Sequence, residues 1–250
     1  MAALPAHTQD AGHAGHDSPA TQAPHPYAQE AYARANLKPG ADLFVIEPWD
    51  ITITKRPIDG GDDFDLAGNY PILPFPADAD LDRGLATLRA SGAVSFVCVT
   101  DPCAPPPLEA LTTAGAHVTP FKQHFIHRFC EDAPIDDMTY DKETRRKVRK
   151  SRSLVTVEQH DFTDPAIRQQ WCALYGELMA RHAVPSQQQF TPEAFDALAE
   201  VSGLHCFAAH SDDGMNAMIL FLQHKGVAYG HLAGVLQDGY RTMSQYALYD

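Results

Sequence analysis

The 250-residue sequence has little positive charge and no long apolar segment. Its 19 lysine and arginine residues are outnumbered by 32 acidic residues, which gives a formal net charge of −13 at pH 7. A dedicated nucleic-acid-binding protein normally has a broad basic surface, so this balance disfavours that class. No apolar run approaches the roughly 20 residues that a membrane-spanning helix needs. The N-terminus also lacks the basic and apolar regions of a signal peptide, so the sequence predicts a cytoplasmic protein without a membrane span.

Cysteines are few and scattered, and the common catalytic motifs are missing. The five cysteines are odd in number, and no two have the C-x-x-C spacing: Cys98, Cys103, Cys130, Cys172 and Cys206. This pattern disfavours both a disulfide framework and a structural zinc site. The sequence also has no G-x-S-x-G elbow, Walker loop, dinucleotide-binding glycine motif or H-E-x-x-H pair. We therefore expect no bound metal and no chemistry of those four classes.

Residues 1–38 are rich in Ala, His, Pro and Gly and show no apolar periodicity. Such a segment cannot bury enough apolar surface to offset the entropy lost on ordering, so the sequence predicts a disordered tail. Its histidines offer metal ligands in principle, but no rigid element fixes their geometry, and an uncommitted tail is the favoured interpretation. These histidines are His7, His13, His16 and His25.

Residues 39–138 alternate between strand and helix patterns, which is typical of α/β proteins. Leucines at helical spacing predict a helix from Leu81 that stops at Gly92. The apolar, β-branched run at 93–100 predicts a strand that is covered on both faces. After a short helix, residues 117–129 predict another strand with aromatic side chains on one face. These aromatic residues are Phe121, Phe125 and Phe129.

Residues 139–250 contain the clearest pattern in the sequence. A basic helix at 142–152 precedes a strand at 153–162, an amphipathic helix at 164–182 and a second helix capped by Thr191. Three strands follow, separated by Asp-Gly and Lys-Gly, and both dipeptides are hairpin signals. The sequence then turns into a further helix and stops inside it. We therefore expect the natural fold to need more strand after the last residue.

The basic helix concentrates seven of the 19 positive residues within 142–152. Two interpretations stay open. The favoured one is a linker helix that docks on the acidic body of its own chain, since like charges destabilise a helix unless a neighbour offsets them. The other is phosphate binding, and an RNA-binding role is a weaker variant of it. The candidate residues for phosphate contact are Arg145, Arg146 and Arg149.

The order of these elements resembles the core of the GNAT acyltransferases, and more closely their FemAB-like branch, in which two GNAT-type halves lie in tandem. Three motifs carry the resemblance: "RRKVRKS" at 145–151, "FTPEAFDAL" at 190–198 and "VAYGHLAG" at 227–234. The resemblance covers roughly residues 41–250. It implies an α/β fold with mixed, partly antiparallel GNAT-like sheets, flanked by helices, in two pseudo-repeated halves.

The resemblance also implies a reaction, the transfer of an acyl or aminoacyl group from a thioester or ester donor to a small-molecule amine without a metal. The implied donor is acetyl-CoA or another acyl-CoA, and aminoacyl-tRNA is the alternative. The glycine pattern that usually holds the CoA pyrophosphate is missing, because "VLQDGYRTMSQ" has Gly239 as its only glycine. The donor therefore stays open. A non-catalytic, degenerate GNAT-like binding or assembly module is the alternative function.

By the same resemblance, the strand "VAYGHLAG" contributes the catalytic residues. A base near this strand takes the proton of the attacking amine, and histidine has a suitable intrinsic pKa. The candidates are Tyr229 and His231. The loop and helix that follow would hold the donor through Gln237, Gly239, Arg241, Thr242 and Ser244. The amphipathic helix at 164–182 would contribute substrate-binding residues, namely Trp171, Tyr175 and Arg181.

Overall fold

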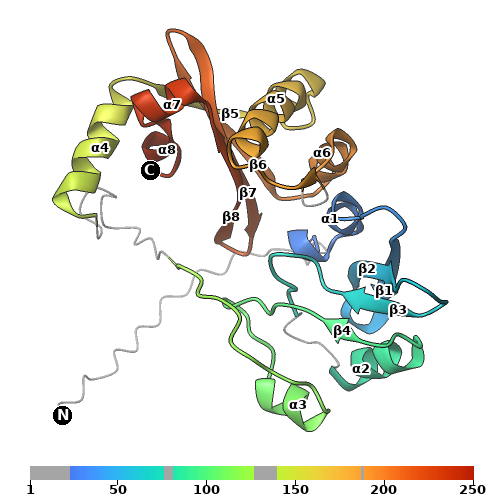
Figure 1. Ribbon diagram of the computed structural model, residues 1–250. Coiled ribbons are helices and arrows are strands. Elements are labelled where there is room, and N and C mark those ends of the chain that lie inside the picture. Colours follow the sequence, from blue (N-terminus) through green and yellow to red (C-terminus); the bar gives the residue numbers. More distant parts are fainter. Residues whose placement is uncertain (1–22, 76–80, 127–139, 187–188) are drawn as a thin grey trace, which may run out of the picture.

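The computed structural model describes residues 23–75, 81–126, 140–186 and 189–250. Two four-stranded sheets, each flanked by helices, make up this part of the chain (Figure 1). The predicted mixed α/β class is therefore confirmed. The predicted boundary at residue 139 and the third phenylalanine, Phe129, lie outside the described residues. The internal repeat stays a prediction.

The first sheet has the order β1-β2-β3-β4. Its strands are β1 (Asp42–Ile46), β2 (Ile51–Pro57), β3 (Phe64–Ala67) and β4 (Phe96–Val97). The first three strands pair antiparallel, and β4 joins β3 in parallel. Its core joins residues of the sheet to Trp49 in the 3-10 helix η2 (Glu47–Trp49) and Leu88 in α2 (Leu81–Ala90). The predicted helix from Leu81 is thus confirmed.

The second sheet has the order β5-β6-β7-β8 and is antiparallel throughout. Its strands are β5 (Thr156–His160), β6 (Leu204–Ser211), β7 (Gly214–His224) and β8 (Val227–Val235). Both predicted hairpins are present. Gly214 and Gly226 have φ values of 109° and 77°, a backbone region in which side-chain-bearing residues are strained. The Asp-Gly and Lys-Gly signals therefore located two tight turns correctly.

Helices cover both faces of the second sheet (Figure 1). On one face, α5 (Pro165–Arg181) and α6 (Pro192–Ala199) pack on the side chains of Cys206, Ala208 and Leu220. On the other face, α8 (Ser244–Leu248) packs on Ala209 and Ile219. The remaining helices on this side are α4 (Lys142–Arg152), which packs on α8, and α7 (Gln237–Thr242). Within the described ranges, every helix is too short or too polar to cross a membrane.

The predicted disordered tail is wrong for its last third. Residues 26–28 form the 3-10 helix η1 (Pro26–Ala28), and α1 (Glu30–Ala35) follows and packs against α6 and β2. Tyr27 and Tyr32 are only 1% and 0% exposed. The segment orders because surfaces from both sheets bury these rings, and local composition does not reveal such distant partners. Residues 1–22, with three of the four tail histidines, lie outside the described residues.

Two predicted strands of the first half need correction. The strand predicted at 93–100 is present only as the two-residue strand β4, and its predicted coverage on both faces is wrong, since Val94 and Val97 are exposed. The predicted short helix is present as α3 (Leu108–Thr113). Residues 117–126 form no strand, and Phe125 is 98% exposed. The alternating aromatic residues therefore predicted a strand wrongly, because no strand among the described residues pairs with this segment.

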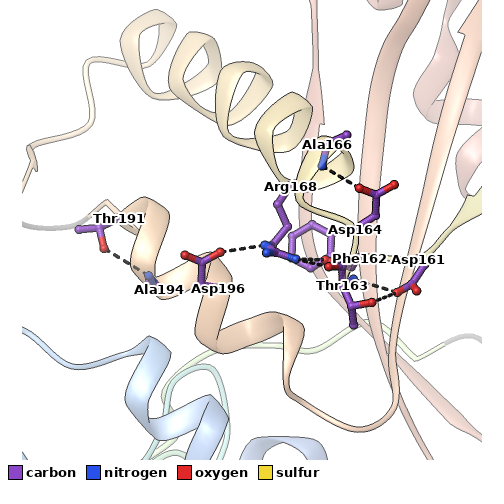
Figure 2. Close-up of polar contacts among 9 residues, drawn as sticks. All are labelled: Asp161, Phe162, Thr163, Asp164, Ala166, Arg168, Thr191, Ala194 and Asp196. Carbon is purple, nitrogen blue, oxygen red and sulfur yellow. Dashed lines mark hydrogen bonds and ion pairs between the residues drawn. The ribbon is translucent and has the colours of Figure 1, made fainter.

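Side-chain caps fix the starts of both helices on the α5/α6 face (Figure 2). The carboxylate of Asp164 accepts a hydrogen bond from the backbone N–H of Ala166 at 2.8 Å. The hydroxyl of Thr191 accepts one from the N–H of Ala194 at 3.3 Å, as predicted from the sequence. Each cap satisfies one of the N–H groups that a helix start leaves without a partner.

Arg168 joins α5, α6 and the loop after β5 (Figure 2). Its Nε donates to Asp196 Oδ1 at 2.8 Å, while its Nη1 donates to the carbonyl oxygens of Phe162 and Thr163 at 3.0 and 2.6 Å. The Arg168 side chain is largely buried, whereas the Asp196 side chain is mostly exposed. The carbonyl contacts should therefore stabilise this corner more than the ion pair does, because exposed ion pairs contribute little.

We expect Arg168→Met to lower the free energy of unfolding by about 1–2 kcal/mol, since it keeps the aliphatic stem but removes charged hydrogen bonds to two carbonyls. The matched control, Asp196→Asn, should cost less than about 1 kcal/mol. Urea denaturation followed by circular dichroism measures both values. Equal losses for the two variants would show that the ion pair matters as much as the carbonyl contacts.

Candidate functional site

The two predicted catalytic residues lie on β8, one of the two edge strands of the second sheet. Along this strand Gly230 pairs with Phe221, and Leu232 pairs with Leu220, so His231 is the extra residue of a β-bulge. A bulge leaves its extra residue outside the regular ladder and changes the direction of its side chain, and bulges are frequent next to active sites. The irregular backbone of β8 therefore lies at His231, one of the two residues that the motif "VAYGHLAG" indicated.

His231 is packed among aromatic rings. Its ring centroid lies 5.4 Å from that of Tyr32, 5.9 Å from Tyr27 and 6.2 Å from Phe190. Both ring nitrogens are buried without a hydrogen-bond partner among the described residues. This burial lowers the pKa of His231 from 6.5 to about 4, because desolvation disfavours the charged ring. The side chain is therefore neutral at pH 7, but it is a weak proton acceptor.

Tyr229 is hydrogen-bonded to a buried carboxylate. Its hydroxyl donates to Asp101 Oδ2 at 2.8 Å, and Asp101 Oδ1 accepts from the backbone N–H of Cys103 at 2.8 Å. Asp101 is only 1% exposed. Burial, followed by the hydrogen bond to Asp101 and its negative charge, raises the pKa of Tyr229 far above its ordinary value. Tyr229 therefore keeps its proton at neutral pH.

Two further histidines complete this group. The His25 ring lies 4.6 Å from that of His224 and 5.1 Å from that of Tyr229, and its Nε2 is 4.0 Å from Asp101 Oδ2. Burial, helped by His224 and opposed by Asp101, lowers the pKa of His25 to about 4. We call this set the junction cluster, because it joins the N-terminal segment, the 98–103 loop and the second sheet. Its members are His25, Asp101, His224, Tyr229 and His231.

Sequence reasoning missed three members of the junction cluster. His25 was assigned to the disordered tail, Asp101 follows the strand predicted at 93–100, and His224 lies before a predicted hairpin turn. No local pattern links these positions, which only the packing of the two halves brings together. A surface hollow of about 230 Å³ lies beside the cluster. Its lining residues are Ala23, Pro24, Ser202, Gly203, His205, Gln223, His224 and Lys225.

The hydroxyls predicted to hold the donor are used inside the fold. Ser244 is fully buried, and its Oγ donates to Asn216 Oδ1 at 2.7 Å. Thr242 Oγ1 lies 2.7 Å from Ser244 Oγ and 3.1 Å from the carbonyl oxygen of Asp238. Gly239 is also packed, because a Cβ there would lie 2.5 Å from the carbonyl oxygen of Asn216. These three residues therefore have clear structural roles at the end of β8.

The other two predicted donor residues, Gln237 and Arg241, are exposed on α7. The guanidinium of Arg241 forms an ion pair with Asp238 one turn earlier in the same helix. Arg181 reaches this region from α5, where its Nη1 donates to the carbonyl oxygen of Val235 at 3.0 Å. Its guanidinium also lies 5.1 Å from the Tyr240 ring centroid. Polar groups of two helices thus meet where β8 ends.

The remaining predicted substrate residues lie in the core. Trp171 is 0% exposed, and Tyr175 is buried beside it, with ring centroids 6.1 Å apart. The Tyr175 hydroxyl accepts a hydrogen bond from the backbone N–H of Phe190 at 3.1 Å. Phe190 in turn contacts His231. Trp171 and Tyr175 therefore support the wall behind His231 from inside the core.

The basic helix α4 docks through one side only. Val148 and Ser151 are buried, and Ser151 Oγ donates to the carbonyl oxygen of Met243 at 2.9 Å. Arg152 pairs with Asp250. The three arginines proposed for phosphate contact form no ion pair with any described residue: Arg145, Arg146 and Arg149. Docking on its own chain is thus present, but within the described ranges most of the positive charge stays uncompensated.

Comparison with known proteins identifies the fold. Residues 140–249 match the family model described as an acetyltransferase (GNAT) domain. The solved structure of FemX is similar at 10% identity and a TM-score of 0.59, over 88% of this chain and 77% of that chain. No curated protein sequence matches the chain.

A second solved structure is the C-terminal domain (DUF2156) of a putative lysylphosphatidylglycerol synthetase from Agrobacterium fabrum. It is similar at 14% identity and a TM-score of 0.53, over 84% of this chain. The chain covers 65% of that structure, which is less than two thirds of its length. Together with the FemX comparison, this confirms a GNAT/FemAB-like fold.

The buried histidines give the fold a pH dependence. The folded-state pKa of His231 lies below its ordinary value of 6.5, so the unfolded chain binds more protons between pH 6.5 and about 4. The free energy of unfolding therefore falls as the pH drops through this window, by at most about 1.4 kcal/mol per pH unit.

We expect His231→Phe to fill the aromatic site and to remove the contribution of one titrating group from the slope of the free energy of unfolding against pH. Urea denaturation at several pH values measures this slope for both proteins. Parallel curves for the two proteins would contradict the assignment.

Proposed function

We propose that this GNAT/FemAB-like chain is an N-acyltransferase that moves an acyl or aminoacyl group from a thioester or ester donor to a small-molecule amine. The observation that carries the proposal is the bulged edge strand β8, which lies within the segment matched to the GNAT acetyltransferase model and contains Tyr229 and His231. The free backbone edge of such a strand offers N–H donors to the oxyanion that forms during acyl transfer. The reaction class is taken by analogy with this fold, and the residues of β8 are the support for it in this chain.

The geometry favours a proton relay through Tyr229. When the amine nitrogen attacks the acyl carbonyl, its proton passes to the Tyr229 oxygen while the tyrosine proton passes to Asp101. Collapse of the tetrahedral intermediate then breaks the bond from the acyl carbon to the donor's sulfur or oxygen, and this leaving group takes up the proton that Asp101 returns through Tyr229. The 2.8 Å hydrogen bond between these two side chains already points in that direction. His231 suits this role less well because its pKa of about 4 makes it a weak base. In this mechanism His231 and the rings around it shape the acceptor pocket.

Acyl-CoA is the proposed donor, bound where β8 enters α7. Gln237 and Arg241 are exposed there, whereas Thr242 and Ser244 are committed to internal hydrogen bonds. Aminoacyl-tRNA is the second candidate donor. The uncompensated arginines of α4 favour it, since they would contact phosphates. One of the two similar structures belongs to a putative lysylphosphatidylglycerol synthetase, whose name also indicates an aminoacylated product.

The donor is tested by thermal denaturation of the purified chain with acetyl-CoA. At a ligand concentration a hundred times Kd, binding stabilises by about 2.7 kcal/mol, which raises the Tm of a chain of this size by about 5–10 °C. We expect Arg241→Ala to reduce this shift. Arg56→Ala, an exposed arginine on β2, serves as the matched control and should leave the shift unchanged.

A flat response in a cooperatively melting protein would exclude acetyl-CoA as the donor. Titration with aminoacyl-tRNA then separates the two remaining candidates. Binding that weakens steeply with salt, and that is lost in the triple variant of Arg145, Arg146 and Arg149 to alanine, would identify a tRNA donor. Absence of binding would favour the degenerate module, for which the internally bonded Thr242 and Ser244 are the supporting observation.

The relay predicts a specific kinetic effect. We expect Tyr229→Phe and Asp101→Asn each to lower kcat by about a hundredfold with little change in KM, since proton transfer contributes that much to many reactions. Release of free CoA from acetyl-CoA, measured with a panel of small amines, reports this rate. Tyr249→Phe removes an exposed hydroxyl outside the junction cluster and should have no effect. Unchanged kcat in Tyr229→Phe would rule out the relay.

A further inference from the structure

We infer that a divalent transition-metal ion, with zinc as the test case, binds between β5 and β6 to Glu158, His160 and His210. The Nε2 atoms of the two histidines lie 3.1 Å apart. Glu158 Oε2 is 3.9 Å from His160 Nε2, and all three ligand atoms lie within 4.8 Å of one another. Two imidazoles and a carboxylate are a common ligand set for zinc and for other late first-row ions.

The distances suit a single ion. Two nitrogen ligands at Zn–N bond lengths of about 2.0–2.1 Å in a tetrahedral site lie about 3.3 Å apart. The 3.1 Å between the two Nε2 atoms is close to this value. The Glu158 side chain is mostly exposed, so a small rotation brings its carboxylate to a bonding distance. Three protein ligands leave the fourth position to water.

The backbone explains why these side chains meet. Glu158 lies opposite Ala208, and His160 lies opposite Cys206, so both point to the face that α5 and α6 cover. The pairing of β5 with β6 stays in register as far as His210, which lies opposite Thr156. Alternate residues of paired strands share a face, so His210 points to the same face as Glu158 and His160, where its Nε2 approaches that of His160. The ligands thus come from rigid strands, while their outer side remains open to solvent.

The ion would act as a clamp on an edge strand. β5 has only five residues, four of which are exposed, and it pairs with β6 alone among the described strands. A metal held by two residues of β5 and one of β6 adds a link that the ladder alone lacks. The site lies at the opposite side of the sheet from β8, so the inference does not depend on the proposed acyl transfer.

A direct hydrogen bond between the two histidines is the competing explanation for their separation. One neutral imidazole can donate to the other at 3.1 Å without any metal. That arrangement leaves Glu158 without a role, whereas a cation uses all three groups. The two explanations therefore differ in whether the chain binds metal tightly through these three residues.

The test uses the full chain after treatment with a chelator, titrated with Zn²⁺ in competition with a chromophoric chelator. We expect one tight site above the weak background of the other 11 of the 13 histidines in the chain. His160→Ala and His210→Ala should each weaken that site by about tenfold or more, and Glu158→Gln should weaken it less. His205→Ala is the matched control, since His205 lies on the same strand but its ring bonds to Gln159 outside the cluster.

Two further measurements distinguish metal binding at this site from the hydrogen bond alone and from misfolding of a variant. Co²⁺ in place of Zn²⁺ should give the intense visible absorption of a tetrahedral site in the wild-type chain and lose it in His210→Gln, which retains a hydrogen-bonding side chain. Circular dichroism shows whether each variant is folded. Wild-type binding no tighter than that of a folded His160→Ala or His210→Gln variant would overturn the inference and leave the hydrogen bond as the explanation.

Discussion

The burial of Tyr27 and Tyr32 between the two sheets is the interaction on which the rest of the structure depends. The Tyr32 hydroxyl donates to the carbonyl oxygen of Tyr70 at 2.6 Å, and Asn69 Nδ2 donates to the carbonyl oxygen of Tyr27 at 2.8 Å. Both contacts attach the N-terminal segment to the first sheet. On its other side, the Tyr27 ring packs against Tyr229 of β8. These two rings, whose centroids lie 4.8 Å apart, thus connect the halves, and each removes a large apolar area from water.

The chemistry of the junction cluster follows from that burial. His25 enters the cluster only because the residues after it are anchored, and the same layer of rings isolates His231 from water. In this environment both imidazoles stay neutral, and the Tyr229 hydroxyl stays protonated beside Asp101. A low-dielectric site strengthens the hydrogen bond between tyrosine and carboxylate. The polar groups to which we assign the proposed acyl transfer are therefore positioned by packing that begins outside the segment matched to the GNAT model.

Sequence reasoning succeeded where the signal was local. The Thr191 cap, the hairpin turns at Gly214 and Gly226 and the basic helix α4 each depend on neighbouring residues, and each is present. It failed where partners were distant. Composition cannot show that Tyr27 meets β8, or that Phe125 has no strand beside it. For the same reason the motif on β8 indicated Tyr229 and His231, but nothing in the sequence pointed to Asp101 as their neighbour.

The second sheet has a polar group at each edge, and each lies next to a β-bulge. On β8 the bulge turns His231 toward the aromatic layer, and in the β6/β7 ladder the register shift beside His210 leaves Asn216 of β7 as the extra residue. Both departures from regular pairing carry a cost in backbone hydrogen bonds, so each needs a compensating interaction. For His231 the compensation is ring packing. For Asn216 the compensation is hydrogen bonding, since its carbonyl oxygen accepts from the N–H of Leu236 at 2.9 Å and its Oδ1 accepts from Ser244 Oγ at 2.7 Å. Because the buried strand β7 separates β6 from β8, each edge can carry its own site.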